Sequence, residues 1–386
     1  MKKTMSMWAL TAAMLSLAAC AANTDSTVDA PESTPMTSSV GTLHGNGASS
    51  EDAESGTGSV SSEGSAGFES LENSTASLPH EKPNITAADN GGEMSGSVFV
   101  LDDGRGIVLF GGSWSGGQSY AETLNQYKAA LGENVNVFSM VVPTAVSFYL
   151  PEKYSYMTGS EWEHIENIND YLDGVIPVDA YTELAKHVDE EIYLRTDNHW
   201  QALGAYYAAK TFAETALADF PELNEENFEF ISRDGYVGTL YGYSEEDARI
   251  RDNPETFTYY KPKTEYTCDF LDYSLEYQYT GAMMLDTDNI AVSSWYMVNM
   301  CGDMYSIHVK TAVKNARKLL IVKDSYGDAL PAFLTKSFEE IWVVDMRHFE
   351  KSVTELCKSE GITDVLFAMN ASSATGINAD NLVNIF

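Results

Sequence analysis

Short apolar strands alternate with helix-length segments over residues 317–370, and this alternation constrains the fold more than any other feature. The sequence predicts strands at RKLLIVK, EIWVVD and ITDVLFAMN, and helices at SYGDALPAFLTKSF and EKSVTELCKSEG. Strands joined by helices become parallel neighbours in one sheet. We therefore expect an α/β domain with a doubly wound, mostly parallel sheet, whose functional residues lie at the carboxyl ends of the strands.

The same rhythm begins near residue 96. SVFVL and GIVLF surround the turn DDGRG and predict a hairpin, and SYAETLNQYKAALG predicts a helix that ends at Gly132. VNVFSMVVP is apolar on both faces, as expected for a central parallel strand. A helix, the short strand GVIPVD and a second helix through Leu217 follow. The predicted domain spans residues 96–386.

Residues 218–317 differ from their surroundings. They are rich in Tyr, Asp and Met and show no clear alternation of strand and helix. We expect this segment to be an insertion or lid that packs on the main sheet.

The N-terminus has the pattern of an export signal. Residues 1–20 contain two lysines, an apolar run and small residues before Cys20, and Leu17-Ala18-Ala19-Cys20 resembles a bacterial lipobox. This resemblance implies a lipidated Cys20 and a protein anchored on the extracellular face of the membrane. A plain signal peptide or a membrane anchor are the alternatives, although the apolar run is short for a membrane span.

Residues 21–95 are predicted to be a disordered tether. They contain one aromatic residue, Phe68, with 12 acidic residues and one lysine. Such a segment cannot bury enough apolar surface to offset its conformational entropy.

Charge and cysteine content exclude several classes of protein. The net charge of −34 disfavours nucleic acid and anionic lipid surfaces as partners. Beyond Cys20 the chain has only Cys268, Cys301 and Cys357, without the paired spacing of zinc or redox sites. One disulfide could form, but none is required, and packing is the expected role.

Ser325 is the candidate nucleophile. It follows the strand RKLLIVK at a strand-to-helix turn, where amide N–H groups can stabilise an oxyanion. The alternative is a helix N-cap, the usual role of a serine at this position.

In RTDNHW, His199 can supply the base that a serine needs, and Asp197 can supply the acid that orients this base. In an extended segment, residues two apart point the same way. Helix capping by Asp197 is one alternative. Metal binding with the upstream His187, Asp189 and Glu191 is another, but zinc-type spacings are absent, so we predict no metal and no cofactor.

The run TDNHWQALGAY, together with IVKDSYGDALPAFLTKSFEEIWVVDMRHF, resembles the DHHW protein family. That family is similar to the SGNH-hydrolase-like proteins of alginate O-acetylation. The resemblance implies an SGNH-like fold with Ser325 as nucleophile, His199 as base and Asp197 as the orienting acid. The chain departs from the family pattern at Asn198, where the family has His, and at Asp328, where members usually have Asn.

Further candidate residues lie near the predicted rim. Arg347 ends the next strand and could bind an acyl oxygen or an acidic sugar, with a salt bridge to Asp345 as the alternative. Tyr326 could line the pocket or only pack. Aromatic residues of the segment 218–317 would suit a carbohydrate platform or could pack within their own domain: Tyr241, Tyr243, Trp295 and Tyr305.

Together these features predict a lipid-anchored extracellular esterase or O-acetyltransferase that acts on a cell-envelope or extracellular polysaccharide. Its partners would be the acyl ester and, for a transferase, a membrane-bound acyl-donor protein. The rival hypothesis is a surface-anchored carbohydrate-binding or assembly protein, in which Ser325, His199 and Asp197 would not converge.

Overall fold

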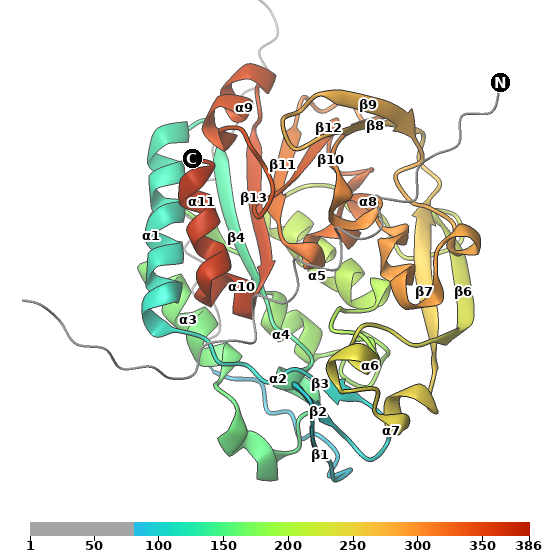
Figure 1. Cartoon of the computed structure of the whole chain (residues 1–386). Helices are drawn as coiled ribbons and strands as arrows, with labels where there is room; N and C mark the ends of the chain where they lie inside the picture. Colours follow the sequence, from blue (N-terminus) through green and yellow to red (C-terminus); the bar gives the residue numbers. More distant parts are fainter. Residues whose placement is uncertain (1–80) are drawn as a thin grey trace, which may run out of the picture. The chain divides into compact units, whose positions relative to one another are not determined.

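The computed structural model describes residues 81–386, apart from the side chain of Asn289 (Figure 1). The predicted signal peptide, the lipidation site Cys20 and residues 21–80 of the predicted tether lie outside this range. Within the described range, no helix is both long and apolar enough to cross a membrane.

A large mixed sheet of eight strands forms the centre of the domain. Its order is β5 (Ile176–Pro177), β4 (Asn136–Val142), β13 (Asp364–Asn370), β11 (Lys318–Lys323), β12 (Glu340–Asp345), β10 (Ser306–Thr311), β8 (Tyr266–Leu271) and β9 (Tyr277–Gly281). The first five strands are parallel to one another. β10, β8 and β9 continue the sheet in antiparallel order.

Two groups of helices pack beside the parallel strands (Figure 1). One contains α1 (Trp114–Leu131), α3 (Glu161–Tyr171), α9 (Val353–Glu360), α10 (Ala371–Thr375) and α11 (Asn381–Asn384); the other contains α4 (Ala180–Ala185), α5 (Ala202–Thr215) and α8 (Pro331–Leu334). Neighbouring residues of β4 face opposite groups. Phe138 contacts Phe212 of α5, whereas the Ser139 hydroxyl bonds that of Tyr120 in α1. Helices therefore cover both faces of β4, which explains its continuous apolar sequence.

The segment 218–317 is more than an insertion, and this corrects the sequence prediction. β8, β9 and β10 belong to the main sheet, and only β6 (Phe228–Tyr236) and β7 (Glu255–Pro262) form a separate hairpin-like pair. The sheet is consequently parallel in one part and antiparallel in the other. Antiparallel strands need only short turns between them, so this part of the chain lacks the helices that revealed the parallel strands.

The entrance of the domain is a small sheet of β1 (Glu93–Ser95), β2 (Val98–Val100) and β3 (Gly106–Ile107). The predicted hairpin is present as β2 and β3. The predicted boundary at residue 96 is too late, however, because β1 pairs with β2. β1 has only three residues, Glu, Met and Ser, which is too short to show the alternation of a strand.

The helix predicted at 325–338 is also different in the structure. A 3-10 turn, η6 (Ser325–Ala329), precedes the short α8, which has Pro331 in its first turn. Proline lacks an amide N–H and is accommodated at a helix start, so it separates the two pieces.

The remaining elements are short. The α-helices are α2 (Val146–Tyr149), α6 (Leu240–Tyr243) and α7 (Ala248–Arg251), and the 3-10 turns are η2 (Glu152–Met157), η3 (Thr287–Asn289), η4 (Val292–Val298), η5 (Gly302–Met304) and η7 (Ile377–Asp380). Cys268, Cys301 and Cys357 are buried free thiols, in agreement with a packing role.

Candidate active site

Ser325 begins η6 one residue after the end of β11, at the carboxyl end of a central strand. The residue that caps this turn is Asp324, whose carboxylate accepts the Tyr326 amide at 2.9 Å. Ser325 is therefore not the N-cap, and the capping alternative does not apply to it. Its hydroxyl is left for another partner.

That partner is His199. The Nε2 atom of His199 lies 2.8 Å from Oγ of Ser325, and Nδ1 lies 2.6 Å from Oδ1 of Asp197. A carboxylate only accepts, so Nδ1 carries the proton, and the Ser325 hydroxyl can donate to Nε2. The predicted arrangement, with His199 between Asp197 and Ser325, is confirmed as geometry.

Asp197 is held by more than its histidine. Its Oδ1 also accepts the His199 amide, and its Oδ2 accepts the Tyr236 hydroxyl and both the amide and the hydroxyl of Thr239, all at 2.9–3.1 Å. Burial raises the pKa of Asp197, but His199 and these hydrogen bonds outweigh it and lower the pKa to about 2. The carboxylate stays ionised and fixed in direction.

The local backbone differs from the extended segment that the sequence predicted. Residues 195–199 form a series of bends, and Asp197 accepts the amide of the residue two positions on. This Asx-type turn, rather than strand alternation, brings carboxylate and imidazole together. Asp197 does not cap the following helix, because α5 begins at Ala202 after Gln201.

Tyr296 positions the imidazole and was missed by the sequence analysis. Its ring stacks on His199 with centroids 3.9 Å apart and planes 9° from parallel. Its hydroxyl donates to the Ser325 carbonyl at 3.1 Å and accepts from the Trp200 indole at 3.2 Å. One side chain thus touches the segments that carry the base and the nucleophile.

Tyr326 packs instead of lining a pocket, which corrects its predicted substrate-binding role. It is 1% exposed, and its hydroxyl donates to the Asn198 carbonyl at 2.5 Å. The bond joins the nucleophile turn to the residue between Asp197 and His199. The fully buried Trp200 packs against the same ring.

The start of η6 offers fewer amides for an oxyanion than the sequence predicted. The Tyr326 amide donates to the Asp324 side chain and the Gly327 amide to the Asp324 carbonyl. In the described part of the chain, the Ser325 amide has no acceptor. The Ser325 amide is therefore the backbone group of this turn that is free to donate to a developing oxyanion.

Comparisons with known proteins identify the family of this chain. A family model described as "DHHW protein" matches residues 73–344. The crystal structure of a DHHW family protein from Eubacterium siraeum is 42% identical, with a TM-score of 0.72, and the match covers 78% of this chain and 98% of that one. This chain belongs to the DHHW family. The family prediction is confirmed.

Two more distant structures also match this DHHW protein, and the first of them is similar to it in fold. Bacillus cereus PatB1 with a sulfonyl adduct has 20% identity and a TM-score of 0.61, covering 73% of this chain and 97% of that one. The O-acetyltransferase domain of Pseudomonas putida AlgJ has 13% identity and a TM-score of 0.39, covering 76% and 99%. A search of functionally curated proteins gives no significant match.

The DHHW motif reads Asp197-Asn198-His199-Trp200 in this member, and the structure explains why the second position can vary. The Asn198 Oδ1 atom lies 2.9 Å from the Thr239 hydroxyl, whose single proton is shared between Asn198 and Asp197. Among the described residues, the Asn198 side chain makes no hydrogen bond to Ser325. Asn198 supports the Asp197 environment from outside the Asp–His–Ser line.

The second departure from the family pattern, Asp328, lies in a buried charge cluster. The fully buried Lys323 ammonium lies 2.5 Å from Asp328, 2.8 Å from Asp345 and 2.9 Å from Asp303. Burial raises the pKa of Asp328 well above its usual range despite the nearby Lys323. The pKa of Lys323 is raised by its three carboxylate neighbours even though burial opposes this. The cluster anchors η6 to the end of β12.

Arg347 forms the salt bridge that was the alternative to substrate binding. Its Nε and Nη2 atoms donate to the two Asp345 oxygens at 2.8 and 2.5 Å, and Nη2 lies 2.6 Å from Asp303. The Arg347 side chain is 22% exposed. Its main visible role is therefore within the charge cluster beside the nucleophile turn.

The structure also shows where the aromatic candidates and the possible metal ligands lie. The aromatic candidates pack within the domain: Trp295 stacks on Tyr236, and Tyr305 contacts Phe270 and Tyr279. His187 bonds Glu190 at 2.6 Å and stacks on Tyr207 rather than joining His199. Within residues 81–386, no three His, Cys, Asp or Glu side chains are grouped to hold a metal ion.

Proposed function

We propose that this DHHW protein is a serine acyl esterase or O-acetyltransferase that acts on O-acyl, above all O-acetyl, groups of a polysaccharide. The observation that carries the proposal is the continuous hydrogen-bonded line from Asp197 through His199 to Ser325. This line is the geometry that activates a serine hydroxyl. The rival binding-protein hypothesis required that these groups not converge.

The reaction follows from the positions of the protons. Ser325 Oγ attacks the acyl carbonyl carbon while its proton passes to Nε2 of His199. The carbon–oxygen bond to the leaving alcohol breaks, and His199 returns the proton to that alcohol. A hydroxyl of water or of a sugar then attacks the acyl-enzyme, gives its proton to His199, and Ser325 regains a proton.

Each neighbouring group has a part in this scheme. Asp197 keeps the Nδ1 proton in place and stabilises the imidazolium that forms, because its own pKa of about 2 leaves it ionised at neutral pH. The Ser325 amide would donate to the oxyanion. Tyr296 holds the imidazole plane by stacking.

The place of action is also part of the proposal. The lipobox-like residues 17–20 would attach the protein to the outer face of the cell membrane, with residues 21–80 as a tether. A transferase at that location requires a membrane-bound partner that supplies acyl groups. The proposal includes an SGNH-like fold in which the parallel strands are doubly wound.

Covalent labelling of Ser325 tests the proposal directly. The PatB1 structure contains a sulfonyl adduct, so a sulfonyl fluoride is a suitable reagent. The wild-type protein should gain one sulfonyl group on Ser325, read by mass spectrometry, and should release acetate from an aryl acetate. Ser325→Ala should abolish both signals, and His199→Ala should reduce both by a similar factor.

Asp197→Ala should retain more activity than either of these variants, because Asp197 orients and stabilises the base without taking the proton. A control is Ser337→Ala, which changes a buried serine just after α8. Labelling that survives Ser325→Ala, or activity lost only on addition of a chelator, would refute the proposal.

A further inference from the structure

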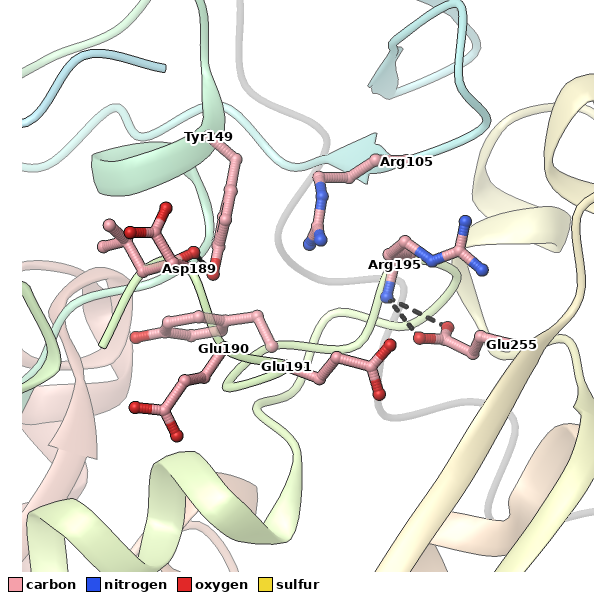
Figure 2. A pocket seen from close by; sticks show the side chains of 9 residues that line it. Arg105, Tyr149, Asp189, Glu190, Glu191, Arg195 and Glu255 are labelled. Atoms are coloured by element: carbon pink, nitrogen blue, oxygen red, sulfur yellow. Dashed lines mark hydrogen bonds between the residues drawn. The ribbon is translucent and has the colours of Figure 1, made fainter. Parts of the chain in front are cut away.

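A cavity of about 200 Å³ lies outside the serine–histidine–aspartate line. It is bounded by Arg105 before β3, Tyr149 of α2, the loop 188–195 and Glu255 at the start of β7. Figure 2 shows the Arg105 side chain extending between Tyr149 on one side and Arg195 on the other. The volume suits a ligand smaller than a drug-sized molecule.

Arg105 is the unusual member of this cavity. Its guanidinium lies over the Tyr149 ring, 4.0 Å from the centroid. Among the described residues no side chain or carbonyl is paired with the Arg105 guanidinium by a hydrogen bond or an ion pair, and its Nη1 atom is buried without a partner. Burial lowers the pKa of Arg105, although nearby carboxylates oppose this. Arg105 as a whole is half-buried, but a buried N–H group without an acceptor is costly, so the Nη1 group requires one.

Glu255, a carboxylate in the cavity wall, is held by donors other than Arg105. Both Glu255 oxygens accept the Arg195 amide, at 2.8 and 2.9 Å, and one also accepts the amide and hydroxyl of Thr196. Figure 2 shows this carboxylate directed at the Arg195 backbone. The Arg195 guanidinium itself donates to the Pro254 carbonyl at 3.3 Å.

The rim of the cavity carries the opposite charge. Asp189 and Glu191 are exposed and, within the described residues, make no hydrogen bond or ion pair. Glu190 differs, since it accepts from Tyr207 and bonds His187. A ligand here would therefore meet a guanidinium inside and acceptor-only carboxylates at the entrance.

We infer that this cavity is a second binding site, for a small carboxylate that carries hydrogen-bond donors at its other end. The carboxylate would meet the flat Arg105 fork, which matches carboxylate geometry in a bidentate manner. Hydroxyl or ammonium groups at the far end would donate to Asp189 and Glu191. Sugar acids and amino acids share this chemistry. The inference does not depend on the proposed acyl transfer.

Titration of the full chain with matched small molecules tests the inference. Glucuronate and alanine each combine a carboxylate with donors, whereas glucose lacks the carboxylate and acetate lacks the donors. By calorimetry, glucuronate or alanine should bind at least tenfold more tightly than both controls. Binding by glucuronate alone identifies a sugar acid, and binding by alanine alone identifies a zwitterion; either result supports the site.

Substitutions then locate the binding. Arg105→Met should weaken it at least tenfold, whereas Arg251→Met, which removes an exposed arginine that forms an ion pair with Asp252, should leave it unchanged. Ser325→Ala should also leave it unchanged, which separates this site from the proposed active site. If Arg105→Met unfolds the protein, the Arg105 Nε–H NMR signal of the wild type should still shift on titration.

Three results would overturn the inference. One is the absence of glucuronate and alanine binding at about 10 mM, well above the Kd that a modest site would show. Another is unchanged affinity in a folded Arg105→Met variant. The third is loss of binding in Ser325→Ala, because it would place the ligand at the nucleophile.

Discussion

Replacing Gly238 by alanine should damage catalysis without touching any reacting atom. An added Cβ at this position would lie 2.5 Å from both the Cβ and the Oδ2 of Asp197. Carbon atoms in contact are normally about 3.5–4.0 Å apart, so Asp197 would have to move by roughly 1 Å. Its 2.6 Å bond to His199 cannot survive a displacement of that size.

We expect kcat/KM for an aryl acetate to fall about 100-fold in Gly238→Ala, the loss typical of a 1 Å misplacement of a catalytic group. The rate of Ser325 sulfonylation should fall in parallel. Overpacking should also cost about 1–3 kcal/mol of stability, so the assay belongs at 25 °C with the folded fraction checked by circular dichroism.

Gly242→Ala is the matched control. Gly242 lies in the same segment, within α6, and an added Cβ there would meet no atom within 4 Å. It should keep wild-type activity. If Gly238→Ala remained folded with activity within twofold of the wild type, the tight seating of Asp197 would not matter for catalysis and our reasoning about the site would be wrong.

Three further results are expected. Tyr296→Phe keeps the stacked ring but loses the hydroxyl bonds, so kcat should fall only a few-fold. Tyr296→Ala also removes the ring, so its kcat should be at least tenfold lower than that of Tyr296→Phe. Equal effects of the two substitutions would contradict the stacking role. Asp328→Asn should have a higher melting temperature than the wild type, and the difference should grow as pH rises above about 4. The reason is that a carboxyl whose pKa is raised by folding contributes stability at low pH and loses it as pH rises. Asp197, with its pKa lowered from 3.8 to about 2, should contribute about 2 kcal/mol above pH 4 that disappears as pH falls toward 2, and urea titrations of Asp197→Asn should lack this component.

The sequence by itself determined the parallel half of the sheet and the three residues of the Asp–His–Ser line. Central parallel strands are buried on both faces, so β4, β11 and β13 appear as continuous apolar runs separated by helices. A serine directly after such a strand must lie at the carboxyl edge of the sheet. The pairing with Asp197 and His199 was found because their spacing and the family resemblance pointed to the same chemistry.

Only the tertiary structure decided how that line is held. Tyr236, Gly238 and Thr239 come from the segment that looked like an insertion, and Tyr296 comes from a 3-10 turn with no periodic pattern. Their contacts with Asp197 and His199 join residues about 40 to 100 positions apart. A tyrosine that packs and a tyrosine that supports a catalytic base have the same local sequence signal.

The charged residues show the same division. The sequence could place Arg347 at the end of the strand after the nucleophile, but it offered a salt bridge and a substrate contact as equal alternatives. Folding brings Lys323 and Asp345 to matching positions of adjacent parallel strands, and adds Asp303 from a distant turn. Buried charges must be neutralised by partners, so the geometry of the whole cluster, and not the chain near Arg347, selected the salt bridge.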